Sequence, residues 1–113
     1  MGVGDRIIML ENSVYSILSP EGYASILWKD SSRAKEAAEK MKLTSYDLLD
    51  FGVIDKVLKE PIGGASKELK TICKSMKKEI VEAIAELKEL DKDKLIENRY
   101  QKFRKMGEYE NLI

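Results

Sequence analysis

The first half of the chain contains three short apolar runs. Each is five or six residues long and rich in β-branched residues, a composition typical of buried strands. The runs cover residues 6–10, 14–18 and 53–58. The first is continuous rather than alternating, so we expect it to lie buried within a sheet near the start of the chain.

A helix is predicted to begin directly after the second run and to extend to about Lys29. Ser19 is a favourable N-cap, Pro20 suits the first helical position, and Glu21 places a carboxylate in the first turn. Gly22 has no side chain, so a ligand could approach the unpaired N–H groups of this turn. The turn is therefore a candidate anion or oxyanion site. An ordinary capped helix is the plainer interpretation.

Two more helical segments are predicted before the third strand. Residues 34–41 carry a stripe of alanines, which indicates close packing against another element. Thr44 with Asp47 resembles a capping box, and Gly52 stands where a helix end favours a left-handed residue. We expect helix, glycine and strand to form one compact unit.

A glycine-containing loop then separates the strands from the last helices. Gly63 and Gly64 lie within Pro61–Ala65, and adjacent glycines allow backbone angles that other residues adopt only at a cost. The loop is either a flexible linker or a backbone segment that approaches a ligand.

The clearest helical periodicity covers residues 66–90, which would extend about 37 Å as a helix. Because this exceeds what a small domain needs, we expect part of its apolar face to contact another chain. Cys73 lies on that face and is predicted to be a buried thiol. Asp91 or Asp93 is predicted to cap a final helix that ends at Gly107.

Charge and composition narrow the possible functions. The 113 residues include 20 basic and 20 acidic side chains, so no net field favours nucleic acid or an anionic membrane. Basic residues on the final helix, Arg99, Lys102, Arg104 and Lys105, are expected to form a solvated face. A contact with the phosphate groups of a ligand or with an acidic partner surface is the alternative.

Chemistry based on metals or ionisable nucleophiles is not expected. One cysteine and no histidine exclude a disulfide within the chain and the usual zinc ligand sets. The missing histidine also removes the commonest general base. With no apolar run of membrane-spanning length and no export signal, the chain is expected to be cytoplasmic and metal-free.

Three motifs resemble one protein family. They are GVGDRIIMLENSVYSILSPEGYASILWKD from Gly2, PIGGASKE from Pro61 and NRYQKFRKMG from Asn98. In this order they resemble the C-terminal part of the alpha subunit of bacterial acetyl-coenzyme A carboxylase carboxyltransferase, a member of the crotonase-like superfamily. The resemblance implies an α/β fold, the C-terminal portion of a crotonase-like (ClpP/crotonase) spiral with a few short strands followed by two C-terminal helices. Residues 1–60 would form a partial core and residues 61–113 a helical extension.

The resemblance also implies an enzymatic role in fatty acid biosynthesis. A carboxyl group would pass from carboxybiotin, carried on the biotin carboxyl carrier protein, to acetyl-CoA, giving malonyl-CoA. The implied partner is a zinc-bearing beta subunit in an α2β2 hetero-oligomer. Backbone N–H donors would stabilise the thioester enolate and the biotin ureido oxygen.

The candidate biotin-binding or substrate-binding residues are Ser19, Pro20, Glu21, Gly22, Gly63 and Gly64. No catalytic side chain is assigned. The family's upstream glycine-rich turn is absent from the sequence, so we expect the chain alone to be inactive. Tyr23 stands where the family resemblance favours a small residue, often cysteine, a change expected to affect packing.

Two other functions fit the sequence. One is a non-catalytic interaction module, in which the two last helices dock a partner and the strands serve as a scaffold. The other is a different crotonase-like acyl-CoA enzyme such as a hydratase, although the sequence does not single out the acidic pair that water addition requires.

Overall fold

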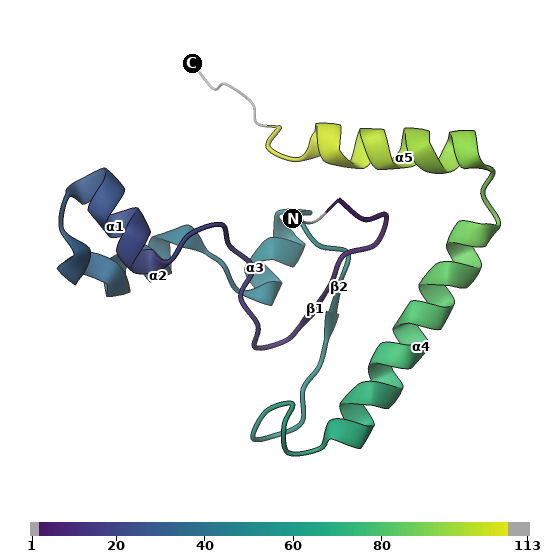
Figure 1. The fold of residues 1–113 in the computed structure, drawn as a ribbon, viewed down its shortest axis with the longest axis horizontal. Coiled ribbons are helices and arrows are strands. Elements are labelled where there is room, and N and C mark those ends of the chain that lie inside the picture. Colours follow the sequence, from purple (N-terminus) through teal and green to yellow (C-terminus); the bar gives the residue numbers. More distant parts are fainter. Residues whose placement is uncertain (1–2, 109–113) are drawn as a thin grey trace.

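The computed structural model describes residues 3–108 and shows an open chain of helices around a small sheet (Figure 1). Gly2, where the first motif begins, and residues 109–113 of the expected helical extension lie outside the described residues. The elements are, in order, β1 (Ile8–Leu10), α1 (Pro20–Trp28), the 3₁₀ helix η1 (Ser31–Arg33), α2 (Ala34–Met41), α3 (Ser45–Asp50), β2 (Lys56–Leu58), α4 (Leu69–Lys88) and α5 (Lys92–Lys105).

The sheet consists of β1 and β2, which pair in parallel with Ile8 opposite Lys56. One face carries the hydrophobic core, where Met9 packs with Leu48 of α3. On the other face, Ile8 and Lys56 line a groove together with Ala83 of α4. Helices thus lie on both faces, as is usual for parallel strands. The α/β class and the two C-terminal helices are confirmed, while the crotonase-like spiral stays a prediction.

The predicted strand over residues 14–18 is wrong. Only Val14 forms a bridge, antiparallel to Thr44. Beyond it, Ser16 Oγ donates to Leu18 O at 2.8 Å, and the Ile17 side chain is 96% exposed. A serine that hydrogen-bonds its own backbone competes with sheet pairing, and no strand of the described chain lies beside this segment to offset that.

The other two strands are shorter than predicted. The third run begins with Val53 and Ile54, whose N–H groups donate to Leu48 O at 2.9 and 3.4 Å and so close the end of α3. Pairing therefore starts only at Lys56. In the first run, Met9 alone is buried.

The predicted starts of α1, α3 and α5 are confirmed by cap geometry. Ser19 Oγ accepts from Gly22 N–H at 3.1 Å, and Thr44 Oγ1 accepts from Asp47 N–H at 3.4 Å. At α5 the choice between two caps is settled in favour of Asp91, whose Oδ1 accepts from Lys94 N–H at 2.7 Å.

The longest helix is α4, which has 20 residues and begins later than the predicted start at residue 66. Ile72 is its buried residue. Cys73 is exposed, so the prediction of a buried thiol is wrong. The sheet lies beside one side of α4, and much of the apolar face is open to solvent. Its large exposed residues are Leu69, Met76, Ile80, Val81 and Ile84.

The segment α1–η1–α2, residues 20–41, forms a helical lobe at one end of the molecule (Figure 1). Ala24 of α1 and Ala37 of α2 are both fully buried, whereas Ala38 is exposed, so the alanine stripe of residues 34–41 is a packing surface only in part. Tyr23 packs edge-on against Trp28, with ring centroids 5.7 Å apart. A two-stranded neck connects the lobe to the sheet, held by the Val14 bridge and by Tyr15 N–H donating to Leu43 O at 3.5 Å.

The whole chain is unusually open for its length. Its surface area is 9080 Å², whereas a compact monomer of 12.9 kDa exposes about 6,300 Å². Its radius of gyration is 17.2 Å, against about 13 Å for a compact domain of this length. Many large apolar side chains are therefore not covered by any other part of the chain.

Candidate functional site

The N-terminus of α1 holds four of the six candidate residues. Pro20 has no N–H, Gly22 N–H is bound by Ser19 Oγ, and Tyr23 N–H donates to Ser19 O at 2.9 Å. Within residues 3–108, Glu21 N–H is thus the amide of this turn without a protein acceptor. The turn offers one donor for an oxyanion rather than several.

The other two candidates lie in the loop between β2 and α4. Gly63 and Gly64 have φ angles of +97° and +95°, so both adopt the left-handed conformation that glycine favours. Gly64 N–H donates to Pro61 O at 3.0 Å, which closes a turn. A Cβ at Gly64 would meet no atom within 4 Å, so its backbone is open to solvent or a ligand.

The structure does not bring the two groups of candidates together. In Figure 1 the N-terminus of α1 lies in the helical lobe, while the Gly63–Gly64 loop lies below the sheet beside the start of α4. The described residues alone therefore do not form a site with two converging donors.

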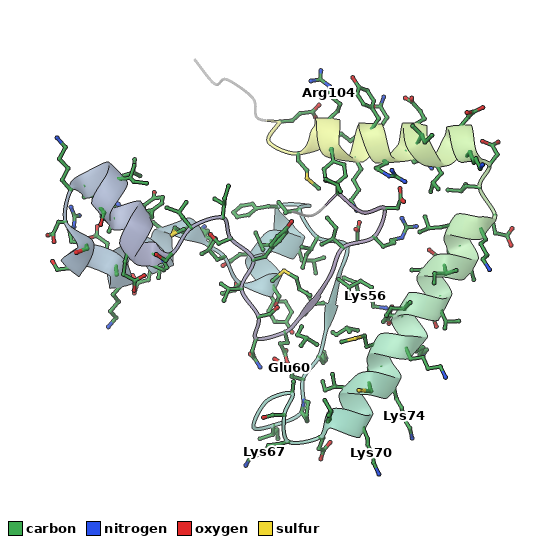
Figure 2. All side chains as sticks on the ribbon, in the orientation of Figure 1. Lys56, Glu60, Lys67, Lys70, Lys74 and Arg104 are labelled. Carbon is green, nitrogen blue, oxygen red and sulfur yellow. The ribbon has the colours of Figure 1, made fainter. Side chains whose placement is uncertain are left out.

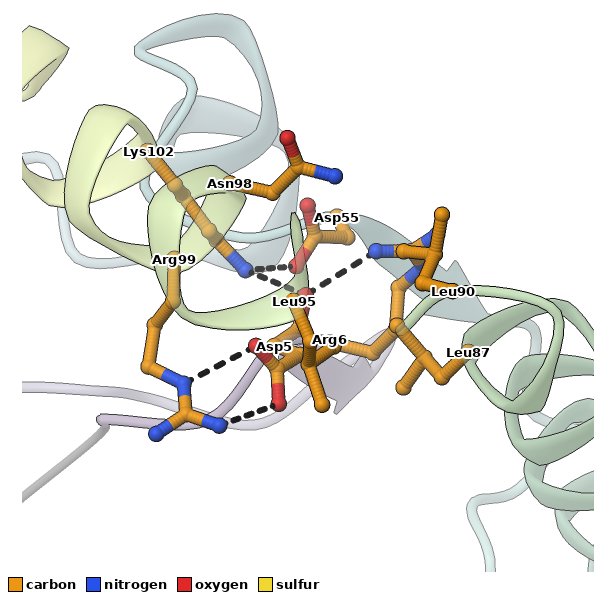
Figure 3. A pocket seen from close by; sticks show the side chains of 9 residues that line it. All are labelled: Asp5, Arg6, Asp55, Leu87, Leu90, Leu95, Asn98, Arg99 and Lys102. Carbon is orange, nitrogen blue, oxygen red and sulfur yellow. Dashed lines mark hydrogen bonds and ion pairs between the residues drawn. The ribbon is translucent and has the colours of Figure 1, made fainter. Parts of the chain in front are cut away.

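A charged cluster that the sequence interpretation missed anchors α5 to the sheet (Figure 3). Arg99 binds Asp5 through two hydrogen bonds of 2.9 and 3.0 Å. Lys102 Nζ donates to Asp55 Oδ2 at 2.5 Å and to Asp5 O at 3.0 Å. Asp55 Oδ2 also accepts from Ile7 N–H at 2.7 Å. Two residues of the expected basic face thus form ion pairs within the chain.

The cluster surrounds a cavity of about 260 Å³. Hydrogen bonds from Arg99 hold the pKa of the Asp5 carboxyl below its usual value, and the carboxylate in turn raises the pKa of Arg99. Because these charges already neutralise one another, the cluster holds α5 in place, and the cavity that it lines is not an anion-binding site.

A second polar group connects the turns that follow the two strands. Tyr46 O–H donates to Glu11 Oε2, and Glu60 N–H donates to Glu11 Oε1 at 3.2 Å. Both bonds lower the pKa of Glu11, the Tyr46 bond most, and the bond between Glu11 and Tyr46 also raises the pKa of Tyr46. Asn12 N–H in turn donates to Glu60 Oε2 at 2.8 Å. The group fixes the turns and leaves no ionisable side chain free for acid–base chemistry.

Charge on α4 is distributed unevenly along the helix. Figure 2 shows Lys70 and Lys74 pointing away from the sheet in its first half. In its second half, Glu79 binds Lys56 at 2.6 Å and Glu86 binds Arg6 at 3.3 Å. The acidic side of α4 therefore faces the sheet, and the lysines face outward.

Two further properties concern only residues 3–108. No helix there is both long and apolar enough to cross a membrane. That part of the chain also groups no three acidic or thiol side chains closely enough to hold a metal ion.

The features above define part of an α/β protein whose candidate donors are backbone amides and whose two polar clusters, at Asp5–Arg99 and at Glu11–Tyr46, are internal contacts. Residues 1–107 match the family described as acetyl co-enzyme A carboxylase carboxyltransferase-like. The chain belongs to this family.

Individual relatives give the same result. The chain is 57% identical over 108 residues to the acetyl-coenzyme A carboxylase carboxyl transferase subunit alpha of Clostridium botulinum, covering 96% of this chain and 39% of that protein. Identity is 54% with the Clostridium acetobutylicum subunit, covering 96% and 40%, and 50% with that of Desulfitobacterium hafniense, covering 97% and 34%. The chain thus spans 34–40% of the length of these relatives, in their C-terminal part.

Proposed function

We propose that this chain serves as the C-terminal portion of a carboxyltransferase alpha subunit, in an assembly that transfers a carboxyl group from carboxybiotin to acetyl-CoA. The observation that carries this proposal is the match of residues 1–107 to the family, with 50–57% identity to alpha subunits. The partners would be a zinc-bearing beta subunit and the biotin carboxyl carrier protein, in an α2β2 assembly. Malonyl-CoA would be the product.

The chain's own contribution is mainly structural. Glu21 N–H supplies one donor at a helix N-terminus, where the dipole favours negative charge. An oxyanion site needs further donors, and one well-placed donor contributes about 3 kcal/mol to transition-state stabilisation. The remaining donors would come from outside this sequence, so we expect no malonyl-CoA decarboxylation by the purified chain alone. Detectable turnover without a beta subunit would contradict this.

A chimera tests the proposed function. The matched 39% of the C. botulinum alpha subunit is replaced by this chain, and the product is co-expressed with the beta subunit of that organism. We expect malonyl-CoA formation within about tenfold of the parent complex, because identity of 57% preserves most of the packing surface. A chimera that assembles fully and transfers no carboxyl group would refute the function.

Substitution of Gly22 in that chimera tests the α1 candidates. A Cβ there would lie 3.4 Å from Leu18 Cδ1 and from Ser19 Oγ, so alanine fits closely and valine crowds the turn. We expect Gly22→Val to lower kcat at least about tenfold, with the complex still assembled, and Gly22→Ala to have a smaller effect. Unchanged rates in the valine variant would remove residues 19–22 from the site.

The exposed apolar face of α4 keeps one alternative open, a non-catalytic interaction module. Leu69 is 64% exposed and Val81 55% exposed, which suits a docking surface. A pull-down with this chain as bait separates the two functions. Recovery of the beta subunit or the biotin carrier supports the carboxyltransferase role, and recovery of neither favours the module.

A further inference from the structure

We propose that α4 and α5 together form a strap, residues 69–105, which ion pairs fasten to the start of the sheet and which a rise in ionic strength releases. The inference concerns the chain itself. It requires neither carboxyl transfer nor a partner, and it therefore goes beyond the proposed function.

The two strands begin with the same pattern of charge. A carboxylate followed by a cation stands before β1, at positions 5 and 6, and again where β2 begins, at positions 55 and 56. The four residues are Asp5, Arg6, Asp55 and Lys56. Because β1 and β2 pair in parallel, both strands start at the same edge of the sheet, and the two acid–base dipeptides lie together at that edge.

The first helix of the strap binds the two cations of this pattern. Glu86 Oε2 lies 3.3 Å from Arg6 Nη2, just before β1. Glu79 Oε1 lies 2.6 Å from Lys56 Nζ, at the first residue of β2. α4 therefore contacts the starts of both strands through carboxylates.

The second helix of the strap binds the two carboxylates of the pattern (Figure 3). Arg99 Nε lies 2.9 Å from Asp5 Oδ1. Lys102 Nζ lies 2.5 Å from Asp55 Oδ2. α5 therefore also spans both strand starts, with the opposite sign of charge. The order of acid and base at the edge thus directs the two helices to different side chains of the same four residues.

Few other interactions hold the strap. The core cluster around Met9 and Leu48 includes, among residues 3–108, no residue of α4 or α5. In the same part of the chain no backbone hydrogen bond joins either helix to the sheet. Both helices are fully described, and Ile72 alone is buried in them. Ion pairs are thus the main connection between the strap and the sheet.

These ion pairs are accessible to salt. The more exposed side chain of each pair has an exposed fraction of 33–68%. Exposed pairs contribute little individually, and they are screened as the Debye length falls from about 10 Å at about 0.1 M salt to about 3 Å at about 1 M. Apolar burial is weakened by denaturants rather than by such salts. Salt therefore separates an ion-paired attachment from an apolar one.

Hydrogen exchange in the full chain measures the release. NMR follows the amides of α4 and α5 at about 0.1 M and about 1 M NaCl. A helix freed from the sheet frays, because isolated helices of this length are marginal in water. We expect the amides of both helices to exchange at least about tenfold faster at the higher salt concentration. The Ala24 and Ala37 amides of the helical lobe are the control and should change by less than about twofold.

Matched substitutions test whether the ion pairs are the cause. Glu79→Gln removes the carboxylate that binds Lys56, and Glu36→Gln removes one that binds Arg33 at 2.9 Å within the lobe. At about 0.1 M NaCl we expect Glu79→Gln to speed exchange in α4 at least about threefold and Glu36→Gln to leave it unchanged. Equal effects of the two variants on α4 would overturn the proposal.

Charge reversal distinguishes an ion pair from packing. Glu79→Lys sets two cations against each other, and Lys56→Glu in the same chain restores opposite charges. We expect the single variant to release α4 and the double variant to recover at least about half of the lost protection. Recovery is partial because Glu82 and Glu86 line the same groove and repel the new carboxylate. A double variant no better protected than the single one would contradict the role of this pair.

Two results of the salt experiment would also overturn the proposal. One is exchange in α4 and α5 that stays unchanged or slows at about 1 M NaCl, the behaviour of an apolar attachment. The other is equal acceleration in the strap and the lobe, which would mean that salt destabilises the whole chain. Carboxyl transfer is not measured in any of these experiments, so their outcome is separate from that of the activity tests.

Discussion

At the scale of single residues, local contacts were predictable from the sequence and distant ones were not. Ser19 and Thr44 cap helices whose amides lie three positions away, and the residue types alone indicate such bonds. Asp5 and Arg99 are 94 positions apart, and no periodicity relates them. A usable signal did exist. Asp5 stands just before the first apolar run and Asp55 lies within the third, just before β2, and parallel strands begin at the same edge of a sheet.

Removal of the Asp55 carboxylate is expected to destabilise the attachment of α5. It accepts from both Lys102 Nζ and Ile7 N–H, so Asp55→Ala leaves Ile7 N–H without its acceptor and removes the ion-pair partner of Lys102. We expect a loss of about 1–3 kcal/mol in the free energy of unfolding, measured by urea denaturation. Asp50→Ala, at an exposed position, is the control and should change stability by less than about 0.5 kcal/mol. Equal midpoints for the two variants would show that the cluster contributes nothing.

Acid is expected to release the Asp5–Arg99 pair. Arg99 lowers the pKa of Asp5 in the folded chain, so the pair stabilises the fold above the unfolded pKa of about 3.9. This stabilisation is lost as the pH falls through the lower folded value. The NMR signal of Arg99 Nε–H should shift over that range, and Asp5→Asn should abolish the shift. A signal that stays constant from pH 6 to the acid limit would argue against the pair in solution.

At the scale of elements, every predicted helix was found, and the strands were predicted poorly. Helical periodicity reports burial along one element, and α4 follows it over 20 residues. A strand also needs a neighbour, which a single run does not reveal. The run 14–18 has β-branched residues but no partner strand in the described chain, so pairing stops after the Val14 bridge and the chain bends at residues 17–18.

The wrong prediction that Cys73 of α4 is buried has a similar origin. Periodicity identifies an apolar face but not how much of it the chain can cover, and here the sheet covers one side only. Cys73 is therefore expected to react fully with a thiol reagent in the native chain, as measured by absorbance without denaturant. Reaction only after addition of urea would mean that this face is buried, for example by self-association.

At the scale of the whole molecule, the family was predictable from three motifs, while the open shape was not. Motifs depend on residue order, which the chain retains, whereas compactness depends on how much surface its elements cover. The same holds for the candidate site, whose residues were predictable from the sequence but whose spatial arrangement was not. The sequence identified the Ser19–Gly22 turn and the Gly63–Gly64 loop, but their separation follows from the arrangement of lobe, sheet and α4. Whether either contacts a substrate stays a prediction.

The open shape is measurable in solution. We expect small-angle X-ray scattering of the free chain to give a radius of gyration near the 17.2 Å of the Cα positions. A value near about 13 Å would indicate that the chain collapses to a compact domain. Measurements over a range of concentrations exclude association as the cause of a high value.

The neck beneath the helical lobe has a consequence for where a ligand could bind. One bridge at Val14 and one long hydrogen bond at Tyr15 are the backbone contacts across it, so little resists a twist between the lobe and the sheet. Glu21 N–H sits beyond this joint and turns with it. A neighbouring surface that fixed the orientation of the lobe would therefore also fix the direction in which Glu21 N–H points.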